Sequence, residues 1–176
     1  IRDFPYGVIK GRYQPVDTIL NLEGSKWDGA RDVLNQFRLN GRYYCAIYEI
    51  SFDSLLYYRK SVLEGAGLKD PRTLFENDEW TWDTFLDMAR QFQQSGDGKY
   101  VIEGYNPENE FVVSTGTPII ENDGTKLINN MNNANVERVM DLLSTLQKEN
   151  LRYPLHELNG WSVNPKAWAQ GDILFY

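Results

Sequence analysis

The residue types that most often carry catalysis or hold metals are scarce in this chain. It has one histidine, His156, and one cysteine, Cys45. A Ser-His-Asp or Cys-His site would have to use His156, and no Gly-x-Ser-x-Gly motif accompanies it. These two residues form no clustered zinc ligand set, and no glycine-rich phosphate-binding motif occurs. We therefore expect no catalytic triad, no metal and no cofactor.

Carboxylates are the remaining candidates for catalysis, because glycoside hydrolysis needs only two of them, about 5 to 9 Å apart. The candidate pairs are Glu49 with Asp53 and Glu108 with Glu110. The chain has 25 acidic residues, so such pairs also arise by chance on a solvated surface. A carbohydrate-active hydrolase using Glu49 and another carboxylate therefore stays open as an alternative to a binding protein.

Charge and hydropathy limit the class of partner. The 176 residues include 18 Lys and Arg against 25 Asp and Glu, giving a formal net charge of −7 without a basic cluster. Tracking a phosphate backbone requires a basic stripe, so we expect no nucleic-acid partner. No stretch approaches the roughly 20 consecutive apolar residues of a membrane helix.

Aromatic residues are unusually abundant, at 14% of the chain. Several lie in predicted connectors rather than on helix faces: Tyr48, Phe52, Tyr105, Phe111 and Trp161. Sugars present C–H faces that stack on aromatic rings and hydroxyls that require polar partners, and Asn, Asp, Glu and Ser accompany these aromatics. The pattern favours a carbohydrate ligand, although each aromatic taken alone fits a structural role equally well.

The elements that must position these residues alternate between helix and strand. Helical spacing of apolar residues predicts helices over 25–37, 60–64, 82–94, 135–146 and 166–170, with Ser25, Thr81 and Asn135 as N-caps. The turn pair Asn40-Gly41 is expected to close the first helix. The apolar face of 135–146 is expected to contain Val136, Val139, Met140, Leu143 and Leu146. Strand patterns cover 42–47, 55–58, 100–104, 125–129 and 172–176, whereas 70–79 and 105–110 are expected to be loops. The segment 111–120 fits a short helix or a strand, and we favour the helix. This alternation predicts an α/β architecture.

The order of motifs resembles one family of proteins. Gly41-Arg-Tyr-Tyr44 is followed by Leu55-Leu-Tyr-Tyr-Arg-Lys60, then by Glu64-Gly-Ala-Gly-Leu68 and Trp80-Thr-Trp-Asp-Thr-Phe85. Ala167-Trp-Ala-Gln-Gly171 precedes the last predicted strand. This succession is similar to the middle of the extracellular solute-binding proteins of ABC transporters, in the sugar-binding group typified by maltose-binding proteins.

The resemblance implies a fold and a mechanism. It implies a periplasmic-binding-protein-like (type II) fold of two α/β lobes, here a fragment with a mixed sheet flanked by helices. Residues 1–47 would end lobe one, 48–53 would form a hinge crossing, and 54–176 would form most of lobe two. The ligand would bind in the cleft, and lobe closure would create the surface that the transporter recognises.

The resemblance also implies site residues and partners. The expected ligand-binding residues are Tyr48, Ser51, Phe52, Tyr105, Asn106, Phe111 and Ser114. The expected partners are a small-molecule solute, most simply a sugar, and the membrane permease of an ABC importer, with the binding protein itself a monomer. We expect an extracellular protein, either a cell-surface lipoprotein or periplasmic.

The first residue is Ile1, and the chain stops within a strand pattern at Tyr176. We therefore expect an internal piece of a longer protein, with a signal peptide or lipoprotein cysteine before Ile1 and a ligand-stacking Trp after Tyr176. A structural or interaction module without its own ligand remains the third alternative, because half a cleft cannot enclose a ligand.

Overall fold

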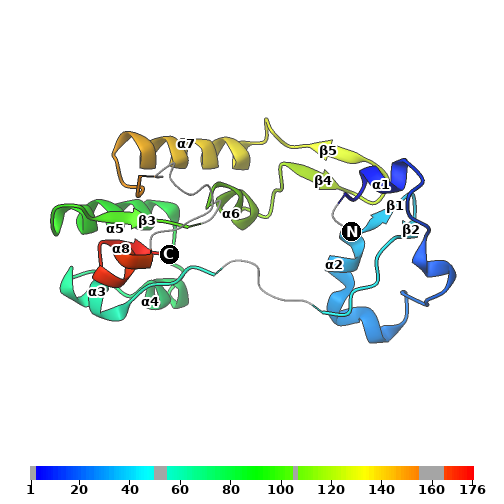
Figure 1. Cartoon of the computed structure of the whole chain (residues 1–176), viewed down its shortest axis with the longest axis horizontal. Coiled ribbons are helices and arrows are strands. Elements are labelled where there is room, and N and C mark those ends of the chain that lie inside the picture. Colours follow the sequence, from blue (N-terminus) through cyan, green and yellow to red (C-terminus); the bar gives the residue numbers. More distant parts are fainter. Residues whose placement is uncertain (1–2, 50–54, 105–106, 155–164) are drawn as a thin grey trace. The chain divides into compact units, whose positions relative to one another are not determined.

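A computed structural model describes residues 3–49, 55–104, 107–154 and 165–176 (Figure 1). The chain divides into two compact units. Unit 1 comprises Ile1–Asp53 and Thr117–Asn133, and unit 2 comprises Ser54–Gly116 and Ala134–Tyr176. The sequence assigned 117–133 to lobe two, whereas the structure groups these residues with unit 1. The correspondence of the units to functional lobes stays a prediction.

Unit 1 consists of short elements. Its helices are α1 (Tyr6–Ile9), the 3-10 turns η1 (Val16–Thr18) and η2 (Ser25–Ala30), and α2 (Arg31–Gln36). Its strands are β1 (Arg38–Leu39), β2 (Arg42–Tyr43), β4 (Ile120–Asn122) and β5 (Leu127–Asn129). Its small core contains Leu22, Leu34 and Tyr43.

Two predictions at the start of unit 1 are corrected. The expected helix over 25–37 divides into η2 and α2, and Ser25 is not its cap, because Gly24 occupies that position without a side-chain hydrogen bond. Asn40 and Gly41 do not close a helix. Both have positive φ, 51° and 74°, and they join the antiparallel strands β1 and β2. Such a two-residue connection matches the twist of a hairpin.

The antiparallel hairpin β4–β5 also belongs to unit 1. Asn122 ties it to the N-terminal residues, because its Nδ2 donates to the carbonyl oxygens of Gln36 at 3.1 Å and Arg38 at 2.8 Å. In its turn, Asp123 Oδ1 accepts hydrogen bonds from Thr125 Oγ1 at 2.7 Å and from the backbone N–H groups of Thr125 and Lys126, both at 2.8 Å. These bonds hold the Asp123 pKa at about 2, with the Thr125 hydroxyl as the largest cause.

Unit 2 carries the longer helices. They are α3 (Lys60–Gly65), α4 (Pro71–Glu76), α5 (Trp82–Gln94), α6 (Pro107–Ser114), α7 (Ala134–Lys148) and α8 (Pro165–Gln170). The strands are β3 (Tyr100–Ile102) and β6 (Ile173–Phe175), which pair in parallel, Ile102 with Phe175. Single bridges extend the pairing on both sides, antiparallel from Tyr58 to Phe175 and parallel from Arg152 to Ile102. This confirms the predicted mixed sheet.

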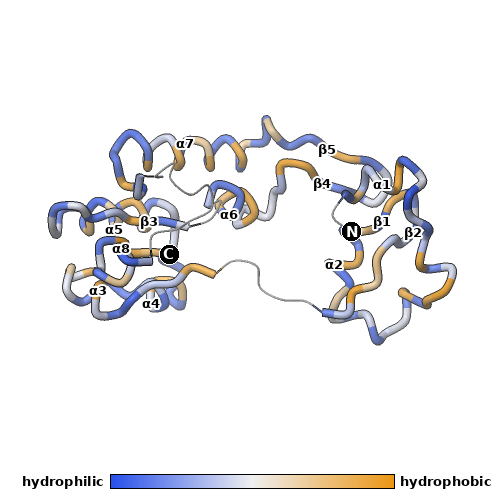
Figure 2. Tube along the Cα trace, viewed as in Figure 1, coloured by the Kyte–Doolittle hydropathy of each residue, from blue (hydrophilic) through white to orange (hydrophobic). Residues whose placement is uncertain are grey.

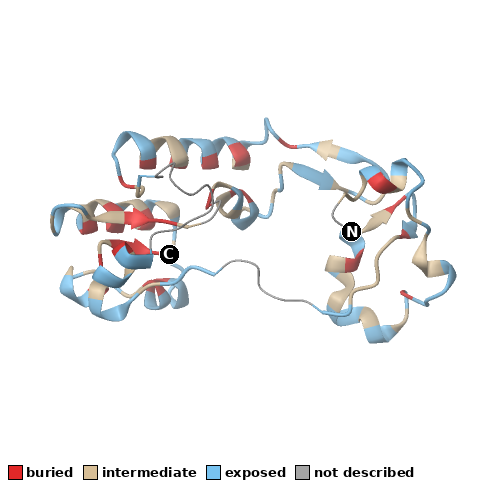
Figure 3. Cartoon of the chain, in the orientation of Figure 1, coloured by how far each residue is buried: buried red, intermediate tan, exposed pale blue. Residues whose placement is uncertain are grey.

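The core of unit 2 forms around this pairing. Phe175 is fully buried, and its ring lies 5.7 Å from that of Phe85, 5.9 Å from Trp80 and 6.2 Å from Tyr58. Helix α5 packs against β3 and begins at the predicted cap, Thr81, whose hydroxyl accepts from the Thr84 N–H at 3.2 Å. Figure 3 shows buried residues at β3, at β6 and at intervals along α7.

Helix α7 is amphipathic, as its alternating colours in Figure 2 show. Val136, Val139 and Leu146 lie on the buried face, as predicted. Met140, which was also expected there, is 43% exposed, and Leu142 is buried in its place. In the described part of the chain, no helix combines the length and apolarity needed to cross a bilayer.

Helix α4 lies where the sequence predicted a loop. Asp70 is its N-cap, with Oδ1 accepting from the Arg72 N–H at 2.9 Å, and Pro71 occupies the first helical position, where its missing N–H costs nothing. The same Oδ1 accepts from the Tyr58 hydroxyl at 2.6 Å, which is the main cause that lowers the Asp70 pKa. Asp70 therefore joins α4 to the strand residue Tyr58.

The Asp70→Ala substitution removes both hydrogen bonds. We expect it to lower the free energy of unfolding by about 1 kcal/mol, the usual cost of a lost N-cap. Urea denaturation followed by tryptophan fluorescence measures this loss, and Asp97→Ala, which removes an exposed loop carboxylate, is the matched control. Equal stabilities of the two variants would contradict the role of Asp70.

A second prediction concerns the titration of Asp123. Because its pKa in the folded chain is about 2, below the usual 3.8, ionised Asp123 stabilises the hairpin above about pH 4, and this contribution is lost as the pH falls toward 2. Carboxyl NMR titration should give a midpoint near 2, and Thr125→Ala should raise it. An unchanged midpoint in that variant would show that the threonine hydroxyl is not a cause.

Candidate functional site

The carboxyl ends of β3 and β6 lie at the same edge of the unit 2 sheet, because the two strands are parallel. In open α/β sheets, ligands bind outside this edge. Glu103 directly follows β3 and Tyr176 directly follows β6. The Glu103 N–H donates to the Phe175 carbonyl oxygen at 3.1 Å, which keeps the two chain segments together beyond the last strand residues.

Three aromatic side chains gather at this edge, and we call Tyr57, Trp168 and Tyr176 the edge aromatic group. Tyr57 and Tyr176 exchange both backbone N–H to O hydrogen bonds, each 2.9 Å long. Residues paired in this way place their side chains on the same face. The Trp168 ring, from α8, lies 5.5 Å from the Tyr176 ring at an interplanar angle of 32°. Tyr57 is 56% exposed, so part of the group is free to stack on a ligand.

Arg59 holds α8 in place behind this group. Its guanidinium donates to the Ala169 carbonyl oxygen at 2.5 Å and to that of Trp168 at 3.4 Å. These carbonyl groups are in the last turn of α8, where a cation is also favoured by the helix dipole. The position of the Trp168 ring therefore depends on a residue of the segment that carries Tyr57.

Glu103 gives the edge an acidic group. Its side chain is buried. The pKa of Tyr176 is raised, first by its own burial and second by the negative charge of Glu103. A carboxylate beside aromatic rings provides a hydrogen-bond acceptor for hydroxyl groups next to surfaces that stack on C–H faces.

The structure describes three of the seven predicted ligand-binding residues. Tyr48 belongs to unit 1 and is 96% exposed. Phe111 and Ser114 lie on α6 in unit 2, and Ser114 Oγ donates to the Phe111 carbonyl oxygen at 2.8 Å. The Phe111 ring packs on Phe85 of the core at 5.9 Å, which accounts for its partial burial. Their contact with a ligand stays a prediction.

Several predicted residues lie outside the described ranges: Ser51, Phe52, Asp53, Tyr105, Asn106, His156 and Trp161. Cys45 falls within the predicted strand 42–47, whereas in the structure it is partly buried and follows β2.

One of the candidate carboxylates for hydrolysis has a structural contact. Glu108 forms an ion pair with Arg152, so its carboxylate holds the first turn of α6 to the segment paired with β3. Glu49 is exposed, and its candidate partner Asp53 is not described. Among the residues that the structure describes, no group of three His, Cys, Asp or Glu could hold a metal ion.

Sequence reasoning did not select the edge aromatic group or Glu103. Strand periodicity does indicate that Tyr57 and Tyr58 face opposite sides, and Tyr58 packs in the core while Tyr57 is exposed. That signal identifies Tyr57 as outward-facing. It does not show that Tyr57 pairs with Tyr176, 119 positions later, because this pairing arises only from the sheet.

The α/β fold with a mixed sheet is the one expected for the solute-binding class of protein. The chain matches the profile of the bacterial extracellular solute-binding proteins over residues 4–176. It belongs to this family, which confirms the resemblance in its motifs.

One solved structure has the same fold. It is the ABC transporter associated binding protein from B. animalis subsp. lactis Bl-04 in complex with beta-1,6-galactobiose, with a TM-score of 0.63 and 19% sequence identity. The match covers 98% of this chain and 41% of that chain, so this chain spans less than half the length of that protein. No curated protein matches the sequence.

The electrostatics of the edge are testable. Glu103→Gln removes the charge while keeping the size, so the Tyr176 pKa should fall toward its ordinary 10.0 but stay above it, because burial is the larger cause. NMR titration of the tyrosine ring carbons measures this shift. Glu137→Gln, on the exposed surface of α7, is the control that should leave Tyr176 unchanged. An unchanged pKa in Glu103→Gln would place the carboxylate away from the ring.

Proposed function

We propose that this chain is part of a protein that captures a carbohydrate and delivers it to the membrane permease of an ABC importer. The observation that carries the proposal is the edge aromatic group beside the buried carboxylate of Glu103, at the carboxyl ends of β3 and β6. Membership of an extracellular solute-binding family supports solute capture. The galactobiose bound by the structural neighbour supports a sugar as the solute.

The chemistry of the edge suits a sugar better than an apolar ligand. Aromatic rings stack on the C–H face of a pyranose, while a carboxylate accepts hydrogen bonds from its hydroxyl groups. The phosphate groups of a nucleic acid would be repelled by a chain whose net charge is −7.

The proposal includes the other expectations from the sequence. Tyr48, Ser51, Phe52, Tyr105, Asn106, Phe111 and Ser114 would contribute further ligand contacts. The protein would act as a monomer, outside the cell membrane, either anchored as a lipoprotein or free in a periplasm. It would bind its solute without chemical change, in keeping with the binding proteins of its family.

Tyr57→Ala tests the edge aromatic group. The ring is half exposed, so its loss should preserve the fold but remove a stacking surface worth about 1 kcal/mol, which weakens sugar binding about fivefold. Isothermal titration calorimetry on the protein at its full natural length, with β-1,6-galactobiose and a panel of glucose and mannose disaccharides, measures the change.

Tyr6→Ala is the matched control, because Tyr6 is a similarly exposed tyrosine of unit 1, 54% exposed. It should bind sugar as the wild type does. Wild-type affinity in Tyr57→Ala would remove the edge aromatic group from the site. Binding of a peptide or a metal chelate, without any response to a saccharide, would overturn the carbohydrate assignment.

A further inference from the structure

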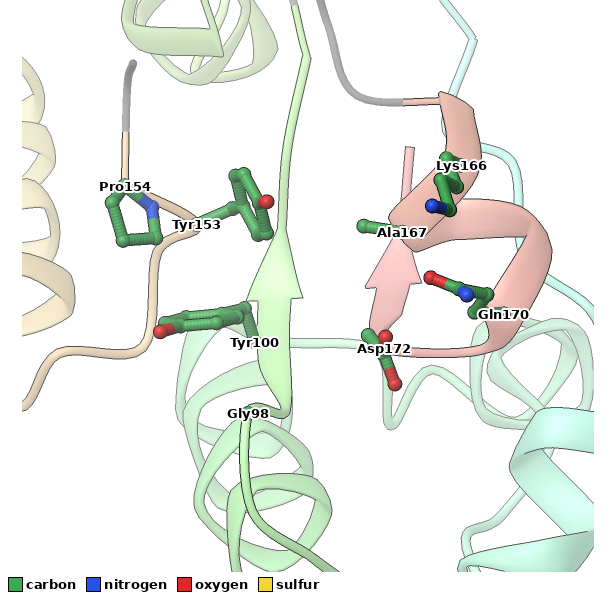
Figure 4. Close-up of a pocket in the computed structure, with 8 residues that line it drawn as sticks. All are labelled: Gly98, Tyr100, Tyr153, Pro154, Lys166, Ala167, Gln170 and Asp172. Atoms are coloured by element: carbon green, nitrogen blue, oxygen red, sulfur yellow. The ribbon is translucent and has the colours of Figure 1, made fainter.

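Unit 2 has a cavity of about 490 Å³ that the proposed carboxyl-edge site does not use (Figure 4). Its volume falls within the range of small-molecule sites, roughly 300 to 1,000 Å³. Six of its lining residues bear on ligand chemistry: Tyr100, Tyr153, Lys166, Ala167, Gln170 and Asp172.

One side of the cavity is aromatic. Tyr100 begins β3, and Tyr153 follows Arg152, the residue paired with Ile102. The backbone holds the second ring in place, because the Tyr153 N–H donates to the Ile102 carbonyl oxygen at 3.1 Å. The two ring centroids are 5.1 Å apart at an interplanar angle of 76°. Two half-buried rings at this angle form a corner rather than a flat surface.

The opposite side is polar and comes from α8. Lys166 and Gln170 are four residues apart on this helix, so they share one face, and Figure 4 shows both on the side of the cavity opposite the rings. Ala167 lies between them and leaves space because its side chain is small. Both long side chains are exposed to solvent.

Two charged residues, Lys166 and Asp172, are among those that line the cavity. Asp172 is already neutralised by Lys99, whose ammonium donates to Asp172 Oδ1 and to the Gly171 carbonyl oxygen, both at 3.0 Å. Within the described ranges, no carboxylate lies within ion-pair distance of Lys166. The lining residues that the structure describes therefore present one uncompensated cation, in a chain whose net charge is −7.

We propose that this cavity is a second ligand site, for a sugar acid of the hexuronate class. The corner of Tyr100 and Tyr153 would hold the C–H face of the pyranose ring, Lys166 would bind its carboxylate, and Gln170 would hydrogen-bond its hydroxyl groups. The Lys166 ammonium would select the acid over the neutral sugar. Asp172, held by Lys99, adds an acceptor for a hydroxyl without adding net negative charge.

The cavity is separate from the carboxyl-edge site. Asp172 directly precedes β6 and Tyr100 is the first residue of β3, so two of the lining residues lie at the amino ends of the strands. Glu103 and Tyr176 follow the other ends of the same strands. Neither Tyr57 nor Tyr176 lines the cavity.

NMR titration of the chain, labelled at tyrosine and on the backbone amides, with sodium D-galacturonate tests the proposal. We expect saturable shifts at Tyr100 and Tyr153 with a Kd on the order of 1 mM, and at least about fivefold weaker binding of methyl galactoside, which lacks the carboxylate. Absence of shifts at these tyrosines, or equal binding of the neutral sugar, would overturn it.

Lys166→Gln should weaken galacturonate binding about fivefold and remove the preference for the acid. Lys148→Gln is the matched control, since it removes an exposed lysine near the end of α7. An equal loss in both variants would mean that galacturonate responds only to overall charge, and the proposed site would be wrong. Unchanged urea midpoints verify that both variants fold.

Tyr57→Ala should leave galacturonate binding intact, which separates failure of this site from failure of the carboxyl-edge site.

Discussion

The parallel pairing of β3 with β6 is the constraint on which the candidate ligand-binding surfaces of unit 2 depend. It joins Tyr100 to Ile173 and Ile102 to Phe175, residues more than 70 positions apart. Val101, Ile173, Leu174 and Phe175 are fully buried, so their backbone groups have no access to water and must bond to neighbouring chain segments. The Val101 N–H, for example, donates to the Leu151 carbonyl oxygen at 2.7 Å. The Phe175 ring then connects the sheet to the neighbouring core aromatics.

This one pairing places two chemically different sets of residues at opposite ends of the same strands. Glu103 and Tyr176 follow the carboxyl ends, whereas Tyr100 and Asp172 lie at the amino ends. Helix α8 serves both sets, since Trp168 packs on Tyr176 while Lys166 and Gln170 line the cavity. Helix α8, which is six residues long, therefore contributes Trp168 to the aromatic group and Lys166 to the cavity.

Local signals predicted the elements that local interactions stabilise. Thr81 and the spacing of Phe85, Ala89 and Phe92 identified α5, because a cap and one apolar face suffice to define a helix. Helix α4 was read as a loop because Asp70-Pro71 also begins turns, and the hydrogen bond from Tyr58 that favours the helix comes from another segment. The edge aromatic group was missed for the same reason: Tyr57 and Tyr176 become neighbours only through the sheet.

The exposed residues at the carboxyl edge can cover only part of a ligand. Leu55, Leu56 and Tyr57 are 55%, 46% and 56% exposed. One exposed apolar side chain is common on a protein surface, whereas a contiguous run of them is unusual. Small-molecule sites bury roughly 70 to 90% of the ligand surface, and one edge of a sheet can cover only one face of a pyranose. A pyranose stacked on Tyr57 would therefore leave its other face in water, which limits the affinity that this edge alone could supply.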